Sequence, residues 1–197
     1  MINIYNYLLA IGAVYSLGFP MESILPLSAG LKPPAGRLQT LSVKEGTAVI
    51  DYAHNPDAVY QVIQLYRKTS SGRILTVLGS AGERDRLKRP LMGRIAISLS
   101  DRVFFTNDDP HGEDPMAILA DLTKTLTGCA SYVVEPDRRK AIFLALDEIK
   151  PGDVVLILGK GHEEFIQYRD RKIPHSDLAV VEDYIRTYRR LTRAHTP

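Results

Sequence analysis

Short apolar runs alternate with amphipathic segments beyond residue 36, and this alternation restricts the possible folds more than any other feature. The apolar runs predict strands at residues 37–43, 47–51, 73–78, 102–106, 131–134 and 153–158. Apolar residues at helical spacing predict helices at 58–68, 90–99, 116–126, 139–149 and 180–193. Strands that alternate with helices form parallel β–α–β units. We therefore expect an α/β fold with a doubly wound parallel sheet, plus a small hairpin that turns at Asp170.

Residues 1–33 differ in character from the rest of the chain. Helical spacing predicts a helix at 3–17 and a short helical turn around 22–25. The stretch 31–36 contains two prolines and a glycine, which is typical of a linker. A short helical hairpin cannot bury a core of its own. We expect two domains, 1–33 and 34–197, the first being the trailing edge of a domain whose body lies outside this sequence.

The composition excludes some classes of protein. A formal net charge of +2 gives no indication of a nucleic-acid or membrane partner. No apolar run approaches the length of a membrane span. Cys129, the single cysteine, forms no disulfide within the chain, and we expect it to be a small buried residue. These features predict a cytoplasmic protein that binds neither nucleic acid nor membrane.

A dense polar cluster follows the apolar run at 47–50. Residues 55–57, Asn-Pro-Asp, are typical of a helix start, with a cap, a first-turn proline and an acid at the positive helix end. Capping does not explain Asp51, Tyr52 and His54 just before them. Polar groups between a strand end and a helix start lie where open α/β sheets bind ligands. We interpret the cluster as part of a site, the alternative being a well-capped turn.

Three more polar loops follow predicted strands. The loop 79–90 is rich in glycine and basic residues that suit an anion, but it lacks the Lys-Ser/Thr ending of a Walker A motif. A solvated charged loop is the alternative there. In the loop 107–115, the adjacent carboxylates of Asp108 and Asp109 could receive a metal ion or an ammonium group. The loop 159–164 reads Gly-Lys-Gly-His-Glu-Glu, which is more polar than a simple turn requires.

Four sequence elements in this order resemble the Mur ligases, and most of all their diamino-acid-adding members. They are Gly36-Arg37, Asp51-Tyr52-Ala53-His54-Asn55-Pro56-Asp57, Gly82-x-Arg84-Asp85-x-x-Lys88-Arg89-Pro90-Leu91-Met92-Gly93 and Gly159-Lys160-Gly161-His162-Glu163. Asn3-Ile4-Tyr5-Asn6 is similar to an Asn-x-x-Asn element near the end of the family's central domain. The resemblance implies that 1–33 is a remnant of that ATPase domain. It implies that 34–197 is the C-terminal domain, a Rossmann-like, mostly parallel sheet of about six strands, one of them antiparallel, flanked by helices.

Such ligases use ATP to convert a carboxylate into an acyl phosphate, which the amine of an amino acid then attacks. The resemblance implies a parent enzyme of peptidoglycan synthesis that uses ATP and Mg2+. Its other partners would be a diamino acid and a UDP-sugar-peptide, UDP-N-acetylmuramoyl-L-alanyl-D-glutamate. The family's P-loop with its Gly-Lys-Thr ending and its carbamylated lysine are not in this sequence. We therefore expect the chain alone to be an inactive monomer that holds no cofactor tightly.

The resemblance also assigns roles to residues that match the family's motifs. The expected ATP contacts are Arg37, Asp51, Tyr52, His54 and Asn55, with Asp51 on the ribose hydroxyls. The expected contacts to the incoming amino acid are Arg84, Asp108, Asp109, His111, Gly159 and Glu163. Neither a complete catalytic set nor a metal site is expected within this chain.

The identity of the amino acid depends on the loop that contains His111. Ligases that add meso-diaminopimelate typically read Asp-Asn-Pro-Arg there, and that arginine binds the distal carboxylate. This chain reads Asp108-Asp109-Pro110-His111, and acids suit a bare ammonium better than a second carboxylate. We therefore expect L-lysine, with L-ornithine as second choice. Two other readings are open: a folylpolyglutamate synthetase or similar amide ligase, and a non-catalytic nucleotide-binding module.

Overall fold

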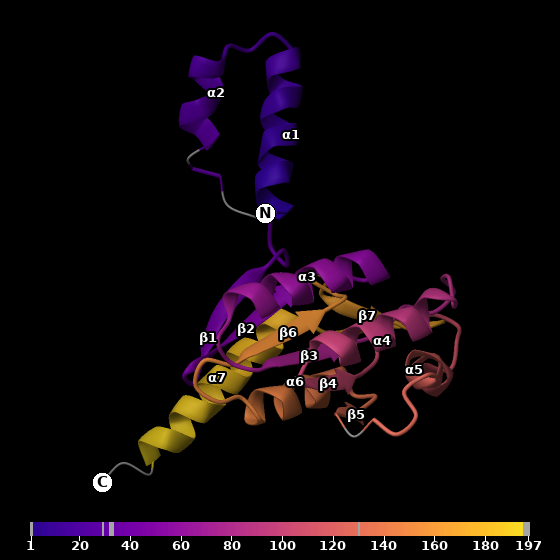
Figure 1. Ribbon diagram of the computed structural model, residues 1–197. Coiled ribbons are helices and arrows are strands. Elements are labelled where there is room, and N and C mark those ends of the chain that lie inside the picture. Colours follow the sequence, from indigo (N-terminus) through magenta and orange to yellow (C-terminus); the bar gives the residue numbers. More distant parts are fainter. Residues whose placement is uncertain (1, 29, 32–33, 130, 195–197) are drawn as a thin grey trace. The chain divides into compact units, whose positions relative to one another are not determined.

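The computed structural model describes residues 2–28, 30–31, 34–129 and 131–194. The chain divides into two compact units between Pro34 and Ala35, one residue from the predicted boundary. Each unit has its own set of elements (Figure 1). Within the described ranges, no helix is long and apolar enough to cross a membrane.

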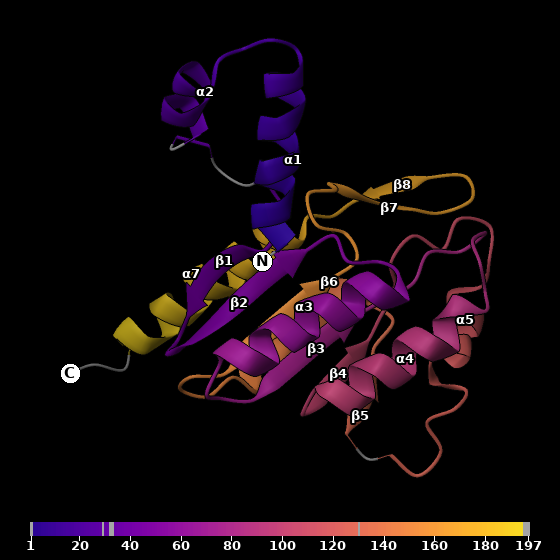
Figure 2. The ribbon, with the colours of Figure 1, turned by 45° about the horizontal axis from the view of Figure 1, so that its top comes forward.

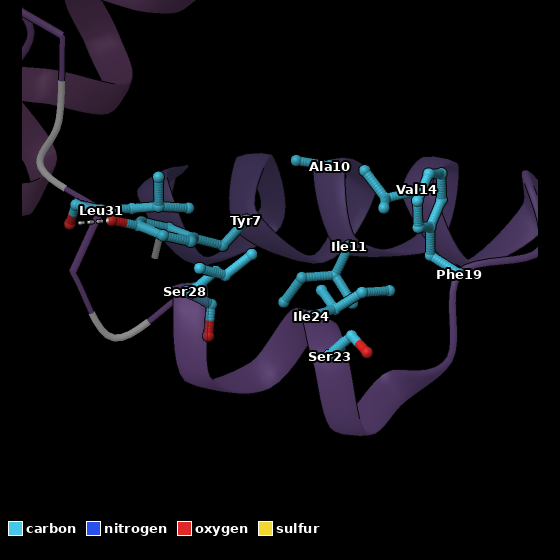
Figure 3. Close-up of a pocket in the computed structure, with 10 residues that line it drawn as sticks. Tyr7, Ala10, Ile11, Val14, Phe19, Ser23, Ile24, Ser28 and Leu31 are labelled. Carbon is cyan, nitrogen blue, oxygen red and sulfur yellow. Dashed lines mark hydrogen bonds between the residues drawn. The ribbon is translucent and has the colours of Figure 1, made fainter.

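The first unit is a pair of helices, α1 (Ile2–Ser16) and α2 (Met21–Ser28). The prediction of a long and a short helical element is confirmed. Ile11 of α1 and Ile24 of α2 point toward each other between the helices (Figure 3). The Tyr7 hydroxyl donates a hydrogen bond of 2.6 Å to the carbonyl oxygen of Leu31, beyond α2. Many large apolar side chains of this unit are nevertheless exposed, including Leu9 at 72% and Leu17 at 76%.

The second unit is built on one sheet, and its predicted fold class is confirmed. The strands are β1 (Gln39–Val43), β2 (Gly46–Asp51), β3 (Ile74–Leu78), β4 (Arg102–Phe105), β5 (Tyr132–Val134) and β6 (Val154–Leu158). Their order is β1-β2-β6-β3-β4-β5, with β1 antiparallel to β2 and the other pairs parallel. A separate antiparallel hairpin consists of β7 (Phe165–Gln167) and β8 (Lys172–Pro174).

Helices cover both faces of the sheet, because the central strands are apolar on both sides. The helices are α3 (Pro56–Thr69), α4 (Lys88–Leu99), α5 (Pro115–Thr123), α6 (Arg138–Asp147) and α7 (Asp177–Ala194). Along β6, Leu156 and Leu158 pack in the core beneath α3 and α4, whereas Val155 and Ile157 pack in the core beneath α6 and α7. The two helical layers lie on opposite sides of the sheet in Figures 1 and 2.

Side-chain caps fix the starts of α3 and α5. Asn55 accepts a hydrogen bond of 2.9 Å from the backbone N–H of Ala58, at the start of α3. Asp114 caps α5 in the same way, with Pro115 at its first position. One prediction in this region was wrong: Cys129 is exposed, because α5 ends at Thr123 and leaves the following turn on the surface.

Candidate functional site

Four loops meet at one edge of the sheet because of the strand register. Asp51, Leu158 and Leu78, the last residues of β2, β6 and β3, are direct neighbours across the sheet. Phe105 of β4 lies beside Leu78. The helices after β2 and β3 lie on one face, whereas those before and after β6 lie on the other. Such a switch in direction leaves a crevice at the carboxyl ends of the strands.

A pocket of 250 Å³ occupies this crevice. Its lining residues are Tyr52, His54, Ala81, Arg84, Lys88, Asp108, Asp109, His111, Gly159 and Glu163. The structure thus brings together all six residues predicted to contact an amino acid. It also places Tyr52 and His54, predicted to lie beside ATP, in the same pocket.

Lys160 connects the acidic residues of the pocket. Its ammonium lies 2.6 Å from Glu163 Oε2, 2.8 Å from Asp109 Oδ1 and 3.5 Å from Asp108 Oδ1. The Lys160 side chain is 0% exposed. The sequence shows this lysine only as part of its motif, because its aspartate partners are 51 and 52 residues away in the chain. The site that could receive an ammonium group therefore already holds one from the protein itself.

The buried charges shift the pKa values of these groups. Burial raises the pKa of Asp108, and the positive charges of Arg138 and Lys160 oppose that shift. Burial alone would lower the pKa of Lys160, but the charge of Asp108 and the hydrogen bonds to Asp109 and Glu163 outweigh it, so this pKa is raised. Lys160 is therefore an ammonium at neutral pH, and it compensates acids that would otherwise repel one another.

The acidic cluster does not fit a magnesium ion while Lys160 is in place. Carboxylate oxygens of Asp108, Asp109 and Glu163 lie within 4.8 Å of one another, close enough for a shared metal ion. However, the Lys160 ammonium contacts all three and occupies the position of a cation. We assign no metal ligand to these residues.

Gly159 allows this close packing of the two acidic loops. Its φ of +115° lies in a region that side chains rarely adopt, and a Cβ there would come within 2.6 Å of Asp108 Oδ2. The loop that contains Asp108 is also tied to the β7–β8 hairpin. Asp109 Oδ1 accepts a hydrogen bond of 2.7 Å from the backbone N–H of Gln167. The backbone N–H of His111 donates a hydrogen bond of 2.9 Å to the Gln167 carbonyl. The hairpin therefore holds His111 beside the pocket.

Tyr52 connects the β2 loop to the acidic cluster. The Tyr52 hydroxyl donates a hydrogen bond of 3.2 Å to Glu163 Oε1. The Arg37 guanidinium lies 5.0 Å from the centroid of the Tyr52 ring. The ring of His54 packs edge-on against it at 4.9 Å. Arg37, which is outside the pocket lining, is thus joined to the pocket through the Tyr52 ring.

Asp51 and Asn55, two of the predicted ATP contacts, have structural partners instead of pocket positions. Asp51 is 5% exposed and accepts hydrogen bonds from the N–H groups of Leu38 and Ala53, at 2.9 and 2.8 Å. The side chain of Asn55 caps α3. The ribose-binding role of Asp51 stays a prediction, and its two backbone hydrogen bonds also give this carboxylate a structural role.

The basic loop after β3 divides into two groups. Arg89 is fully buried and pairs with Glu113 and Asp121, so it is not available to an anion in the pocket. Arg84 and Lys88 line the pocket. Lys88 donates a hydrogen bond of 3.0 Å to the His54 carbonyl, and burial lowers the pKa of Lys88. The cationic side of the pocket thus comes from two of the loop's basic residues.

An open α/β sheet with a charged pocket across its switch point defines a ligand-binding domain of the Rossmann-like class. Residues 36–161 match the family described as "Mur ligase, glutamate ligase domain". The chain belongs to the Mur ligase family.

Known proteins of this family cover nearly all of the chain. A UDP-N-acetylmuramoyl-L-alanyl-D-glutamate--2,6-diaminopimelate ligase from Solibacter usitatus is 40% identical over 191 residues, which are 95% of this chain and 38% of that protein. A solved structure of a ligase of the same name has a TM-score of 0.75 and 33% identity, covering 95% of this chain and 39% of its own. This chain therefore spans about two fifths of the length of these relatives.

A folylpolyglutamate synthase from Thermotoga maritima has a TM-score of 0.52 and 21% identity, over 75% of this chain and 33% of its own. That similarity shows a shared fold only, so it gives no support to the alternative reading as a folylpolyglutamate synthetase.

Proposed function

We propose that this chain supplies the pocket for the incoming amino acid in an ATP-dependent ligase that forms a carbon–nitrogen bond. The parent reaction would join a diamino acid to UDP-N-acetylmuramoyl-L-alanyl-D-glutamate during peptidoglycan synthesis. The observation that carries this proposal is the meeting of Arg84, Asp108, Asp109, His111 and Glu163 in one pocket. ATP and Mg2+ would act in the parent enzyme, and the expected inactivity of the chain alone stays a prediction.

Within the pocket, the chain's own residues would bind and orient the amino acid. Arg84 is suited to one carboxylate, because its planar guanidinium can donate two parallel hydrogen bonds. Glu163 is the most exposed of the three acids, at 25% of its side chain, and it could accept a hydrogen bond from a substrate ammonium. Holding both ends of the substrate fixes the direction of its attacking amine.

We further propose that the amino acid is 2,6-diaminopimelate, in place of the L-lysine expected from the sequence. The Solibacter usitatus protein and the solved structure at 33% identity are both named as 2,6-diaminopimelate ligases. L-Lysine would require Asp108 and Asp109 to be free for the substrate ammonium, whereas Lys160 is paired with both. With those acids compensated, Arg84, Lys88 and His111 leave room for a second carboxylate.

The test is an assay of the full-length parent protein with ATP, the UDP-sugar-peptide and one amino acid at a time. Diaminopimelate, L-lysine and L-ornithine are compared at equal concentration, and both phosphate release and the amide product are measured. We expect diaminopimelate to give the highest rate. A preference for lysine or ornithine would contradict the choice of amino acid, and the absence of any amide product would contradict the ligase function.

A further inference from the structure

Arg138 is buried at a position that helix stability does not explain. It is the first residue of α6, where the helix dipole disfavours a cation. Its side chain and that of its partner Asp177 are both 0% exposed. The guanidinium donates to both oxygens of Asp177, through Nε at 2.8 Å and Nη2 at 2.7 Å. Removing two charges from water is costly, so such a pair is weak grounds for stability alone.

The other hydrogen bonds of Arg138 go to the two loops that form the acidic side of the pocket. Nη1 donates a hydrogen bond of 3.2 Å to the carbonyl of Asn107, and Nη2 donates one of 3.0 Å to the carbonyl of Leu158. Asn107 directly precedes Asp108, and Leu158 directly precedes Gly159 and Lys160. One rigid, planar group therefore fixes the starting points of both loops.

The same network reaches the far end of the second loop through His175. The His175 ring nitrogen Nε2 lies 2.8 Å from Asp177 Oδ1. The backbone N–H of His175 donates a hydrogen bond of 3.0 Å to the Glu164 carbonyl. The loop that contains Lys160 and Glu163 is thus anchored on both sides. The charge of Arg138 also opposes the rise that burial produces in the pKa of Asp108.

We propose that Arg138 is a positioning residue for the amino-acid pocket: it fixes the backbone before Asp108 and before Gly159, and so sets the distance across which Lys160 meets the acids. The importance of this distance for ligation rests on the function proposed above. The positioning itself is tested without any substrate, so failure of one proposal is distinguishable from failure of the other.

The experiment measures how fast the amine of Lys160 is labelled in the purified chain. Reductive methylation is followed by peptide mass spectrometry, with the exposed Lys68 as an internal reference. In the native chain Lys160 is fully buried, so its labelling is slow. For Arg138→Met, we expect labelling of Lys160 to rise about tenfold, the change in open population expected when a charge-assisted hydrogen bond is lost.

Arg73→Met is the matched control. Arg73 also pairs with an aspartate, Asp153, at 2.6 Å, and it donates a hydrogen bond of 2.7 Å to the carbonyl of Glu148. These contacts lie at the opposite end of β6 from the pocket. All variants are labelled well below their unfolding temperatures. We expect Arg73→Met to lower the unfolding temperature and to leave Lys160 labelling at the native rate.

Arg138→Lys keeps the charge but lacks the planar fork, so we expect intermediate labelling. It also provides the measurement if Arg138→Met does not fold. Native-rate labelling of Lys160 in Arg138→Lys, or equal labelling in Arg138→Met and Arg73→Met, would overturn the proposal.

Discussion

At Lys160, one ammonium group contacts three carboxylates, and this arrangement changes the net charge that the pocket presents to a ligand. Without it, Asp108, Asp109 and Glu163 would form a strongly acidic site suited to a cation. With Lys160 in place, the negative charge of the three acids no longer outweighs the positive charge of Arg84 and Lys88. A substrate with two carboxylates is therefore compatible with the pocket.

Asp51 offers a direct test of a structural role. Its buried carboxylate accepts two backbone hydrogen bonds, so Asp51→Ala should lower the free energy of unfolding by about 1.5–3 kcal/mol. Urea unfolding of the isolated chain measures this change. Gln61→Ala, at an exposed position in the middle of α3, is the control and should change the value by less than about 0.5 kcal/mol. Equal stability of the two variants would show that Asp51 is not needed for folding.

Glu113 gives a pH-dependent prediction. The hydrogen bonds from Arg89 lower its pKa to about 2, below the ordinary value of 4.5. A lowered carboxylate pKa stabilises the folded state above the unfolded pKa, and this contribution is lost as the pH falls toward the folded pKa. Glu113→Gln should therefore be less stable than the native chain at about pH 7, and the difference should shrink between about pH 4.5 and pH 2.

Urea midpoints across this pH range measure the difference, with Glu182→Gln, at an exposed position on α7, as the control. A difference in urea midpoint between Glu113→Gln and the native chain that is the same at both ends of the pH range would contradict the lowered pKa of Glu113.

Among the elements, the central strands and the capped helices were the most predictable from the sequence. β3 and β6 are buried on both faces and stand out as continuous apolar runs. The Asn-Pro-Asp sequence at 55–57 marks the start of α3 within two residues. The motif loops could also be placed at one edge of the sheet, because parallel strands end together. Side-chain partners across that edge could not be predicted, because Lys160 and Asp108 are 52 residues apart.

The two helices of the first unit should exchange their amide hydrogens faster than the sheet of the second unit. Between residues 5 and 28, Ile24 alone is buried, whereas every residue of β3 and β6 is buried. Elements with few buried apolar contacts open at lower free energy. Hydrogen exchange followed by mass spectrometry on the isolated chain measures the two rates. Equal protection of α1 and β3 would contradict this prediction.

At the scale of the whole molecule, the fold and the family agree, and the pocket supports the function proposed above. The sheet matches the Mur ligase family over residues 36–161, and its switch point holds the predicted amino-acid contacts. The first unit stays a predicted remnant of the central domain. Tyr52 and His54, predicted to contact ATP, line the same pocket as Arg84, and their contact with ATP stays a prediction.

The most direct test of the central claim is the KM of the full-length ligase for diaminopimelate when Arg84 is changed to Met. Loss of a hydrogen bond between charged groups should raise this KM by about tenfold to a hundredfold. The KM for ATP should stay within about twofold, because Arg84 would hold only the amino acid. Arg94→Met, at an exposed position on α4, should leave both values unchanged. An unchanged diaminopimelate KM in Arg84→Met, or an equal rise in Arg94→Met, would contradict the assignment of this pocket to the amino acid.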